Sequence, residues 1–200
     1  MHLIELADFS APARGCAVCL GTFDGVHLGH RALLRETVAA ARAEDLLPCA
    51  YTFDLPPASV LGKCRAAVLT PIGEKAALMA SCGIDTVVYS HFDAQVAAHS
   101  AEYFFQELLL KRLNAKHIVI GFHYHFGQFA RGDAQLMRAF CEQAGVALTV
   151  VPPVRTGEGE LVSSSAIRQC LAAGDREKAE SMLNRALSAG EEALLGGRET

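Results

Sequence analysis

The 200-residue sequence contains no uninterrupted apolar run long enough to cross a bilayer, so we expect no membrane-spanning helix. It also has no excess of basic residues, because 18 Lys and Arg stand against 22 Asp and Glu, for a formal net charge of −4. That balance gives no electrostatic reason to expect nucleic acid or an anionic membrane as a partner. Residues 1–10 lack the basic start and apolar centre of a signal peptide. We therefore expect a cytoplasmic protein.

The seven cysteines lack the regular spacing of a disulfide framework, and we interpret them as reduced, mostly buried thiols. Cys16 and Cys19 form a lone Cys-x-x-Cys, and without a second pair a zinc or redox role is not favoured. His123 and His125 could form a metal pair, but no third ligand stands out. We predict no metal site built from protein side chains.

Short apolar runs alternate with helical patterns along the chain. The predicted strands are residues 17–20, 49–53, 86–89, 117–120 and 147–151. The predicted helices are residues 30–44, 71–82, 101–113, 134–144, 165–173 and 176–187. Thr70-Pro71 predicts a helix start, with Thr70 as the N-cap and Pro71 at the first helical position. The alternation predicts an α/β fold with a five-stranded parallel sheet and helices on both faces.

Four unusual segments each follow a predicted strand. They are residues 21–30, 54–57, 121–127 and 157–168. Parallel strands joined by right-handed crossovers bring the loops that follow them to one edge of the sheet, where ligands bind in such folds. We therefore expect the four segments to form one cleft.

Residues 21–30 read Gly-Thr-Phe-Asp-Gly-Val-His-Leu-Gly-His. A glycine-bearing turn between a strand and a helix offers unpaired backbone N–H groups to a phosphate. His27 and His30, three residues apart, lie on adjacent parts of one helix surface and can donate hydrogen bonds to phosphate oxygens. Gly29 leaves room for the phosphate to approach. The alternative reading of the glycines is an ordinary turn.

Two later segments suit the same cleft. Ser163, Ser164 and Ser165 precede Arg168, which suggests phosphate binding, although a serine N-cap with a solvated arginine gives the same pattern. Residues 121–127 alternate histidine and aromatic side chains, which suits a flat heteroaromatic ligand or simple packing on the sheet. No nucleophile has an evident neighbouring base, which fits transfer between two bound substrates.

Residues 21–30 resemble the H-x-G-H signature of a nucleotidyltransferase superfamily with a Rossmann-like fold. More narrowly, they resemble the FAD synthetase (FMN adenylyltransferase) domain of the bacterial bifunctional riboflavin kinase/FAD synthetase family. The resemblance covers about residues 15–187 in order. Its further motifs are Thr52-Phe53 with Pro57, Leu69-Thr70 with Glu74-Lys75, residues 121–127, residues 163–168, and Gly174-Asp175 with Ala179 and Met182-Leu183.

Three positions depart from the family pattern. Leu55-Pro56 stands where the family has Pro-His, His123 where it has Asn or Asp, and Ser165 where it has Thr. The first two departures fall on the side of the cleft where the resemblance implies the flavin.

The resemblance implies adenylyl transfer from ATP to FMN, giving FAD and pyrophosphate, with Mg²⁺ accompanying the phosphates. It implies catalytic roles for His27, His30 and Arg168 at the transferred group and the triphosphate. The ATP-binding residues it implies are Gly21, Phe23, Asp24, Gly29, Gly121, Ser164 and Ser165. Asp24 is the nearest candidate carboxylate for Mg²⁺, and its alternative reading is a turn residue. The flavin-binding residues it implies are Pro56, Pro57, His123 and Phe126.

The expected domain organisation is an FMN adenylyltransferase-like domain over residues 1–187 and a flexible tail over residues 188–200. We expect no riboflavin kinase domain in these 200 residues, which fits either a stand-alone adenylyltransferase or a piece of a longer protein. Two alternative functions remain: a flavin or nucleotide binder with weak or lost catalysis, and a nucleotidyltransferase acting on another phosphorylated acceptor. The expected partners are small-molecule substrates, and the sequence does not predict the oligomeric state.

Overall fold

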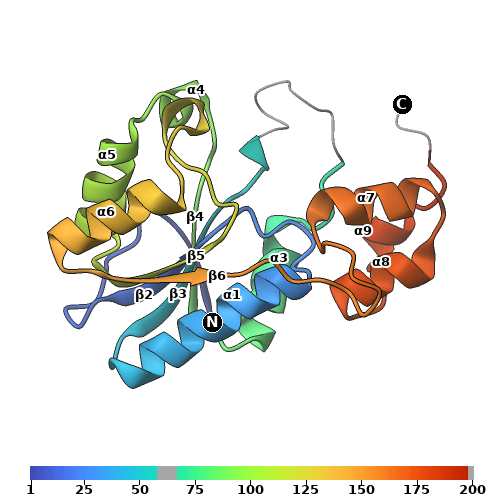
Figure 1. The fold of residues 1–200 in the computed structure, drawn as a ribbon, viewed down its shortest axis with the longest axis horizontal. Helices are drawn as coiled ribbons and strands as arrows, with labels where there is room; N and C mark the ends of the chain where they lie inside the picture. The colour runs from blue at the N-terminus through green and yellow to red at the C-terminus, as the bar shows by residue number, and fades with distance from the viewer. Residues whose placement is uncertain (58–66, 198–200) are drawn as a thin grey trace.

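The computed structural model describes residues 1–57 and 67–197 and places one parallel sheet between helices (Figure 1). The strands are β1 (His2–Glu5), β2 (Cys16–Leu20), β3 (Leu47–Phe53), β4 (Thr86–Ser90), β5 (Ala115–Gly121) and β6 (Ala147–Val151). Their order across the sheet is β1-β4-β3-β2-β5-β6, and every neighbouring pair is parallel. The predicted α/β fold is therefore confirmed.

The sheet has six strands and not the predicted five. The missed strand, β1, lies at the edge and pairs only with β4. Its residues are exposed or half-buried, whereas all five residues of β2 are buried. An edge strand with one partner carries a weaker apolar signal than a central strand, so its absence from the prediction has a physical reason.

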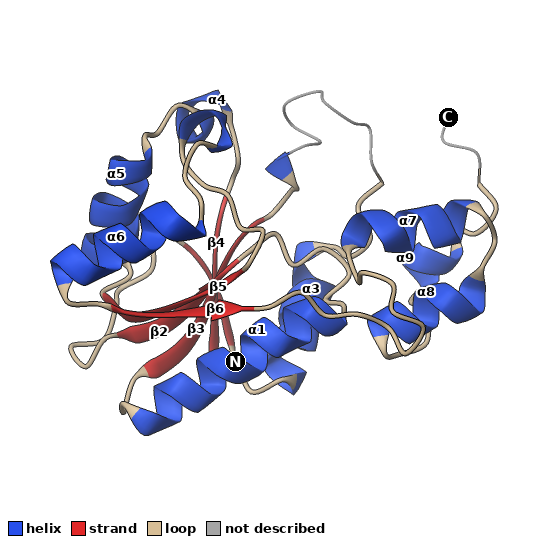
Figure 2. Cartoon of the chain, viewed as in Figure 1, coloured by secondary structure: helices blue, strands red, loops and turns tan. Residues whose placement is uncertain are grey.

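The helices cover both faces of the sheet (Figure 2). They are α1 (Leu28–Ala43), α3 (Ile72–Ser81), α4 (Ala94–Ala97), α5 (Ala101–Tyr103), the π-helix η1 (Phe104–Arg112), the short 3-10 helix η2 (Gln128–Ala130), α6 (Ala134–Ala144), α7 (Ser164–Ala172), α8 (Arg176–Leu183) and α9 (Ala189–Glu192). α1 and α3 pack on one face, and η1 and α6 pack on the other. No helix among the described residues is long and apolar enough to span a membrane.

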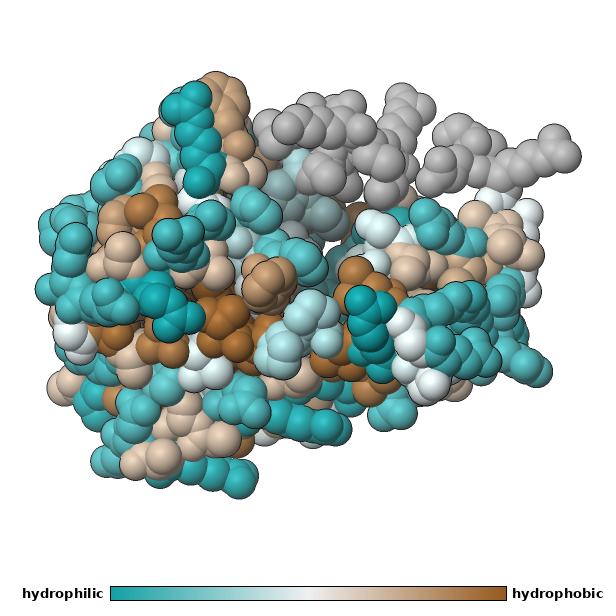
Figure 3. Space-filling model, viewed as in Figure 1, coloured by the Kyte–Doolittle hydropathy of each residue, from teal (hydrophilic) through white to brown (hydrophobic). Residues whose placement is uncertain are grey.

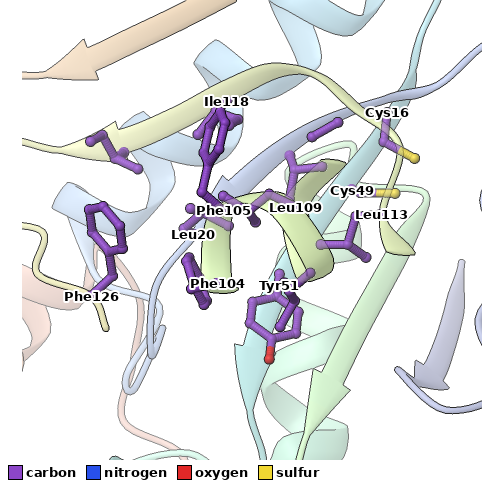
Figure 4. Close-up of a cluster of buried hydrophobic side chains, with 14 of the residues drawn as sticks. Cys16, Leu20, Cys49, Tyr51, Phe104, Phe105, Leu109, Leu113, Ile118 and Phe126 are labelled. Atoms are coloured by element: carbon purple, nitrogen blue, oxygen red, sulfur yellow. The ribbon is translucent and has the colours of Figure 1, made fainter. Parts of the chain in front are cut away.

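Alternating side chains of β2 divide the core between the two faces. Cys16 and Leu20 point to the side of η1, where Phe104, Phe105 and the neighbouring apolar side chains fill the space (Figure 4). Cys19 points to the opposite side, toward α1 and α3. A strand buried on both faces is typical of a parallel sheet. Packing on both faces of β2 fixes the position of its carboxyl end.

The three C-terminal helices form a separate apolar cluster beside the sheet (Figure 1). Leu69, which precedes α3, packs into this cluster and joins it to the rest of the chain. Residues 188–197 do not form the predicted flexible tail. Ser188 caps α9, and Glu191 is completely buried in an ion pair with Arg185. The apolar residues Leu194 and Leu195 also pack on the cluster.

Candidate active site

The turn between β2 and α1 has a strained backbone. Phe23, Gly25 and Val26 have φ values of +49°, +86° and +41°. Positive φ is costly for phenylalanine and valine, so the surrounding structure must impose it. Several contacts do so: Gly25 N–H donates to Thr70 Oγ1 at 3.1 Å, and Ser164 Oγ donates to the Asp24 carbonyl at 2.8 Å. The side chain of Phe23 is fully buried beneath the turn.

Helix α1 begins two residues earlier than predicted, at Leu28, which makes His27 its N-cap. His27 Nδ1 accepts the backbone N–H of His30 at 3.3 Å. The two imidazole rings stack with centroids 3.7 Å apart and an interplanar angle of 17°. Since Nδ1 of His27 is an acceptor, its proton resides on Nε2, which can donate to a ligand.

Burial keeps both imidazoles uncharged in the free protein. It lowers the pKa of His27 to about 4. Burial, and then the neighbouring His27 and the ammonium of Lys75, hold the pKa of His30 well below its usual range. His30 Nδ1 is buried and has no hydrogen-bond partner among the described residues. Because a buried polar atom without a partner is costly, this nitrogen is a natural point for a ligand to contact.

A cleft of about 380 Å³ opens in front of these histidines. Its lining comes from the ends of β2, β5 and β6, from the start of α1 and from residues 161–163. Three of the four predicted segments contribute to it, whereas residues 54–57 do not. Six of the predicted site residues lie on it: Gly21, His27, Gly29, His30, Gly121 and His123. Gly29 leaves room for the His27 ring, since a Cβ there would lie 3.1 Å from it.

Asp24 lies behind the cleft and not in its lining. It is 1% exposed, and its Oδ1 accepts the backbone N–H groups of Leu69 and Thr70, both at 3.0 Å. Its other oxygen pairs with Arg168, whose Nε donates to the Ala67 carbonyl at 2.8 Å. The structure thus gives both residues protein partners. No group of three or more His, Cys, Asp or Glu that could hold a metal occurs in residues 1–57 and 67–197.

The other predicted residues lie outside the cleft lining. Phe126 is buried against Phe104, with ring centroids 5.5 Å apart. Ser165 is exposed at the start of α7, whereas Ser163, which caps that helix by accepting the Ala166 N–H, does line the cleft. Pro56 is buried and Pro57 half-buried, and neither lines the cleft. The structure therefore does not bring the two prolines and Phe126 together with the histidine pair.

Further cleft residues lie in the predicted segments but were not assigned a role: Phe122, Tyr124, His125, Leu161 and Val162. Pro152, Pro153 and Val154 also line the cleft and lie outside the four predicted segments. Phe122 is 59% exposed, which is unusual for a large apolar side chain and fits a ligand surface. Apolar side chains gather over β6 and the chain that leads from it to α7 (Figure 3). Pro152-Pro153 directly follows β6, and that position was the available signal.

Comparison with known proteins places this site in a family. The FAD synthetase family model matches residues 10–166. A bifunctional riboflavin kinase/FMN adenylyltransferase of Escherichia coli (strain K12) is 36% identical over 174 residues, which cover 86% of this chain and 55% of that protein. A putative bifunctional riboflavin kinase/FMN adenylyltransferase of Geobacillus thermodenitrificans is 33% identical over 177 residues, 87% of this chain and 92% of that protein.

The chain thus spans about half the length of the Escherichia coli relative. A crystal structure described as a macrolide-efflux protein from Streptococcus pneumoniae superposes with a TM-score of 0.81 and 30% identity, covering 94% of this chain and 63% of that chain. The family match includes the strained turn, the histidine pair and most of the cleft. The chain therefore belongs to the FAD synthetase family.

Proposed function

We propose that this chain transfers the adenylyl group of ATP to FMN, producing FAD and pyrophosphate. The observation that carries the proposal is the stacked pair of neutral histidines at the start of α1, facing a cleft in a chain of this family. Helix starts attract phosphates through unpaired N–H groups and the helix dipole. The relatives named above carry FMN adenylyltransferase in their names.

In the proposed reaction, a phosphate oxygen of FMN attacks the α-phosphorus of ATP in line. A new P–O bond forms while the bond from that phosphorus to the bridging oxygen breaks, and pyrophosphate leaves with the electron pair. Charge on the transferred group is stabilised by hydrogen bonds from the His27 Nε2–H and from His30. The nucleotide would bind as its magnesium complex, in which Mg²⁺ would supply positive charge to the phosphates. Asp24 is a poor candidate ligand for it, because both of its oxygens have protein partners.

The apolar wall at Pro152, Pro153 and Val154 fits a flat ring of either substrate. The assignments of Ser164, Ser165 and Arg168 to the triphosphate, and of Pro56, Pro57, His123 and Phe126 to the flavin, remain part of the proposal. For Arg168, phosphate binding would use the guanidinium N–H groups that do not contact Asp24 or Ala67.

The test is to incubate the protein with FMN, ATP and Mg²⁺ and to follow FAD by chromatography. His30→Ala should lower turnover by about 100-fold or more, as loss of a charge-stabilising donor does, while circular dichroism shows a folded protein. His2→Ala, at an exposed position in β1, is the control and should keep full activity.

Full activity in His30→Ala would contradict the role of the histidine pair. Calorimetric binding of FMN and ATP without FAD formation would favour a binding protein instead. Formation of a different adenylylated product, in a screen of phosphorylated acceptors with labelled ATP, would favour another acceptor.

A further inference from the structure

Lys75, in the first turn of α3, is a lysine buried in the protein interior. It is 1% exposed, and its ammonium donates to the carbonyl oxygens of Thr22 at 2.9 Å and Phe53 at 3.1 Å. Burying an ammonium group costs several kcal/mol unless partners compensate for lost water. Here the direct partners are neutral carbonyls, and among the described residues no carboxylate forms an ion pair with this ammonium.

The two carbonyls that Lys75 contacts lie at the ends of neighbouring strands. Phe53 is the last residue of β3, and Thr22 follows β2 and lines the cleft. The Thr22 carbonyl also accepts the hydroxyl of Thr52 at 3.1 Å. The ammonium group therefore joins the turn that precedes the histidine pair to the end of β3.

The charge of Lys75 also acts on the histidine pair. Its ammonium contacts the carbonyl of Thr22, which lines the same cleft as His30, and its positive charge contributes, after burial and His27, to lowering the pKa of His30. Burial lowers the pKa of Lys75 itself, and the carboxylates of Asp24 and Asp54 act in the opposite direction. Asp24 and Asp54 thus favour the charged form of the lysine, while burial disfavours it.

The cleft lining has no fixed positive charge of its own. Within the described residues it contains no Lys, Arg, Asp or Glu, and burial lowers the pKa of its two inner imidazoles, His27 and His30. Two arginines close to the turn already form ion pairs with carboxylates: Arg168 with Asp24, and Arg185 with Glu191. A triphosphate carries several negative charges, so a cleft that binds it needs positive charge close behind its surface.

We propose that Lys75 is a positioning residue for the nucleotide: its ammonium fixes the Thr22 carbonyl and supplies, from behind the cleft, positive charge that favours the triphosphate. This inference rests on the proposed nucleotide-binding function. Lys75 acts through the turn and through its electric field, without touching the substrate.

The experiment compares three variants of the full chain by calorimetric titration with ATP and with inorganic pyrophosphate, each with Mg²⁺ and without FMN. Lys75→Met removes the charge and both hydrogen bonds. Lys75→Gln removes the charge and keeps a donor of similar position. Lys116→Met removes one positive charge from an exposed position in β5 and is the matched control.

We expect both Lys75 variants to bind ATP and pyrophosphate about tenfold more weakly or worse, the scale of one charge in a partly desolvated site, and Lys116→Met to bind like the parent protein. The pKa of His30, followed by histidine NMR, should rise in both variants, which a merely structural role would not produce. Parent-like affinity for ATP and pyrophosphate in Lys75→Gln would overturn the proposal. It would show that hydrogen bonds to the Thr22 and Phe53 carbonyls support binding without the charge.

A measurement on the unaltered protein covers the case in which neither variant folds. The ammonium of a buried lysine exchanges its protons slowly, so ¹⁵N-lysine NMR should show a Lys75 signal that shifts when pyrophosphate is added. A signal that stays unchanged at saturating pyrophosphate would overturn the proposal. Absence of FAD formation by the parent protein would contradict the proposed function alone, because these titrations do not depend on FMN.

Discussion

The histidine pair is stabilised in its uncharged form by the same burial that shapes the site. His27 is 6% exposed and its pKa is about 4, against an ordinary value of 6.5. Its neutral ring can accept the His30 N–H, whereas a doubly protonated ring could not. Protonation of His27 would therefore remove the N-cap of α1.

This pKa shift predicts loss of stability in acid. The unfolded chain takes up a proton on His27 near pH 6.5 and the folded protein only near pH 4, so the unfolded state binds more protons between these values. The contribution of neutral His27 to the free energy of unfolding is fully present above pH 6.5. It falls by about 3 kcal/mol as the pH falls toward 4. Urea denaturation at intervals across this range measures it.

His27→Asn is the informative variant, because asparagine caps a helix well and does not titrate. Its free energy of unfolding should fall less steeply with acid than that of the parent protein. His2→Asn, at an exposed position, should leave the slope unchanged. Equal slopes for the His27 variant and the parent would show that His27 is not the titrating group.

At the scale of single residues, the sequence predicted the segments that form the cleft better than the side chains that face it. His27, His30 and the glycines around them follow from a local pattern, since strand, turn and helix start are consecutive. The burial of Asp24 depends on Leu69, Thr70 and Arg168, which are 45, 46 and 144 residues away. Contacts over such separations leave no periodic signal in the sequence.

Among the secondary-structure elements, helix starts and helix types differ most from prediction. The helix expected at residues 101–113 forms, but Phe104–Arg112 has π-helical hydrogen bonding. Apolar spacing predicts that a segment is helical and cannot distinguish the two kinds of helix here. Thr70 does not cap α3, because Pro71 occupies that position and the Thr70 hydroxyl accepts the Gly25 N–H instead.

Gly127 provides an element-scale prediction. Its φ is +72°, and a Cβ there would lie 2.7 Å from the backbone nitrogen of Ala101, at the start of α5. Gly127→Ala should therefore lower the free energy of unfolding by more than the ~1–2 kcal/mol that a left-handed alanine costs alone, because the loop or α5 must also move. Denaturant titration measures the change.

Gly145, the C-cap of α6, is the matched control. It also has a positive φ, +65°, but a Cβ there has no neighbour within 4 Å. Gly145→Ala should cost only the left-handed strain, about 1 kcal/mol. Equal losses in the two alanine variants would show that the contact with Ala101 is unimportant.

At the scale of the whole molecule, the C-terminal helices are tied to the turn before α1. Ser164 and Arg168 contact Asp24, and Arg185 donates to the Gly25 carbonyl at 3.3 Å. The Arg185 guanidinium also forms two short hydrogen bonds with Glu191, of 2.6 and 2.7 Å. The sequence predicted α7 and α8 but not this connection, which joins α9 to the turn.

The Arg185–Glu191 pair predicts strong coupling between its members. Arg185→Met and Glu191→Gln should each lower the free energy of unfolding by about 3 kcal/mol, because each leaves a buried partner without its counter-charge. The double variant should lose less than the sum of the two, by about 1–3 kcal/mol. Urea denaturation of the parent, the two single variants and the double variant measures this coupling in a double-mutant cycle.

The exposed pair Arg14–Asp45 is the control, since its side chains are 50% and 92% exposed. Arg14→Met should change the free energy of unfolding by no more than about 1 kcal/mol. Strict additivity in the Arg185 and Glu191 double variant would mean that the two side chains do not stabilise each other in solution.

The contact between Arg185 and Gly25 bears on the order of events during protein synthesis. It joins residues 160 positions apart, and a ribosome delivers the chain from its N-terminus. The strained turn at Phe23 and Val26 can gain this contact only after residue 185 has emerged. Nascent chains thus pass through a stage in which the sheet is available but the turn still lacks the support of Arg185, and the cleft is complete only after residue 185 has emerged.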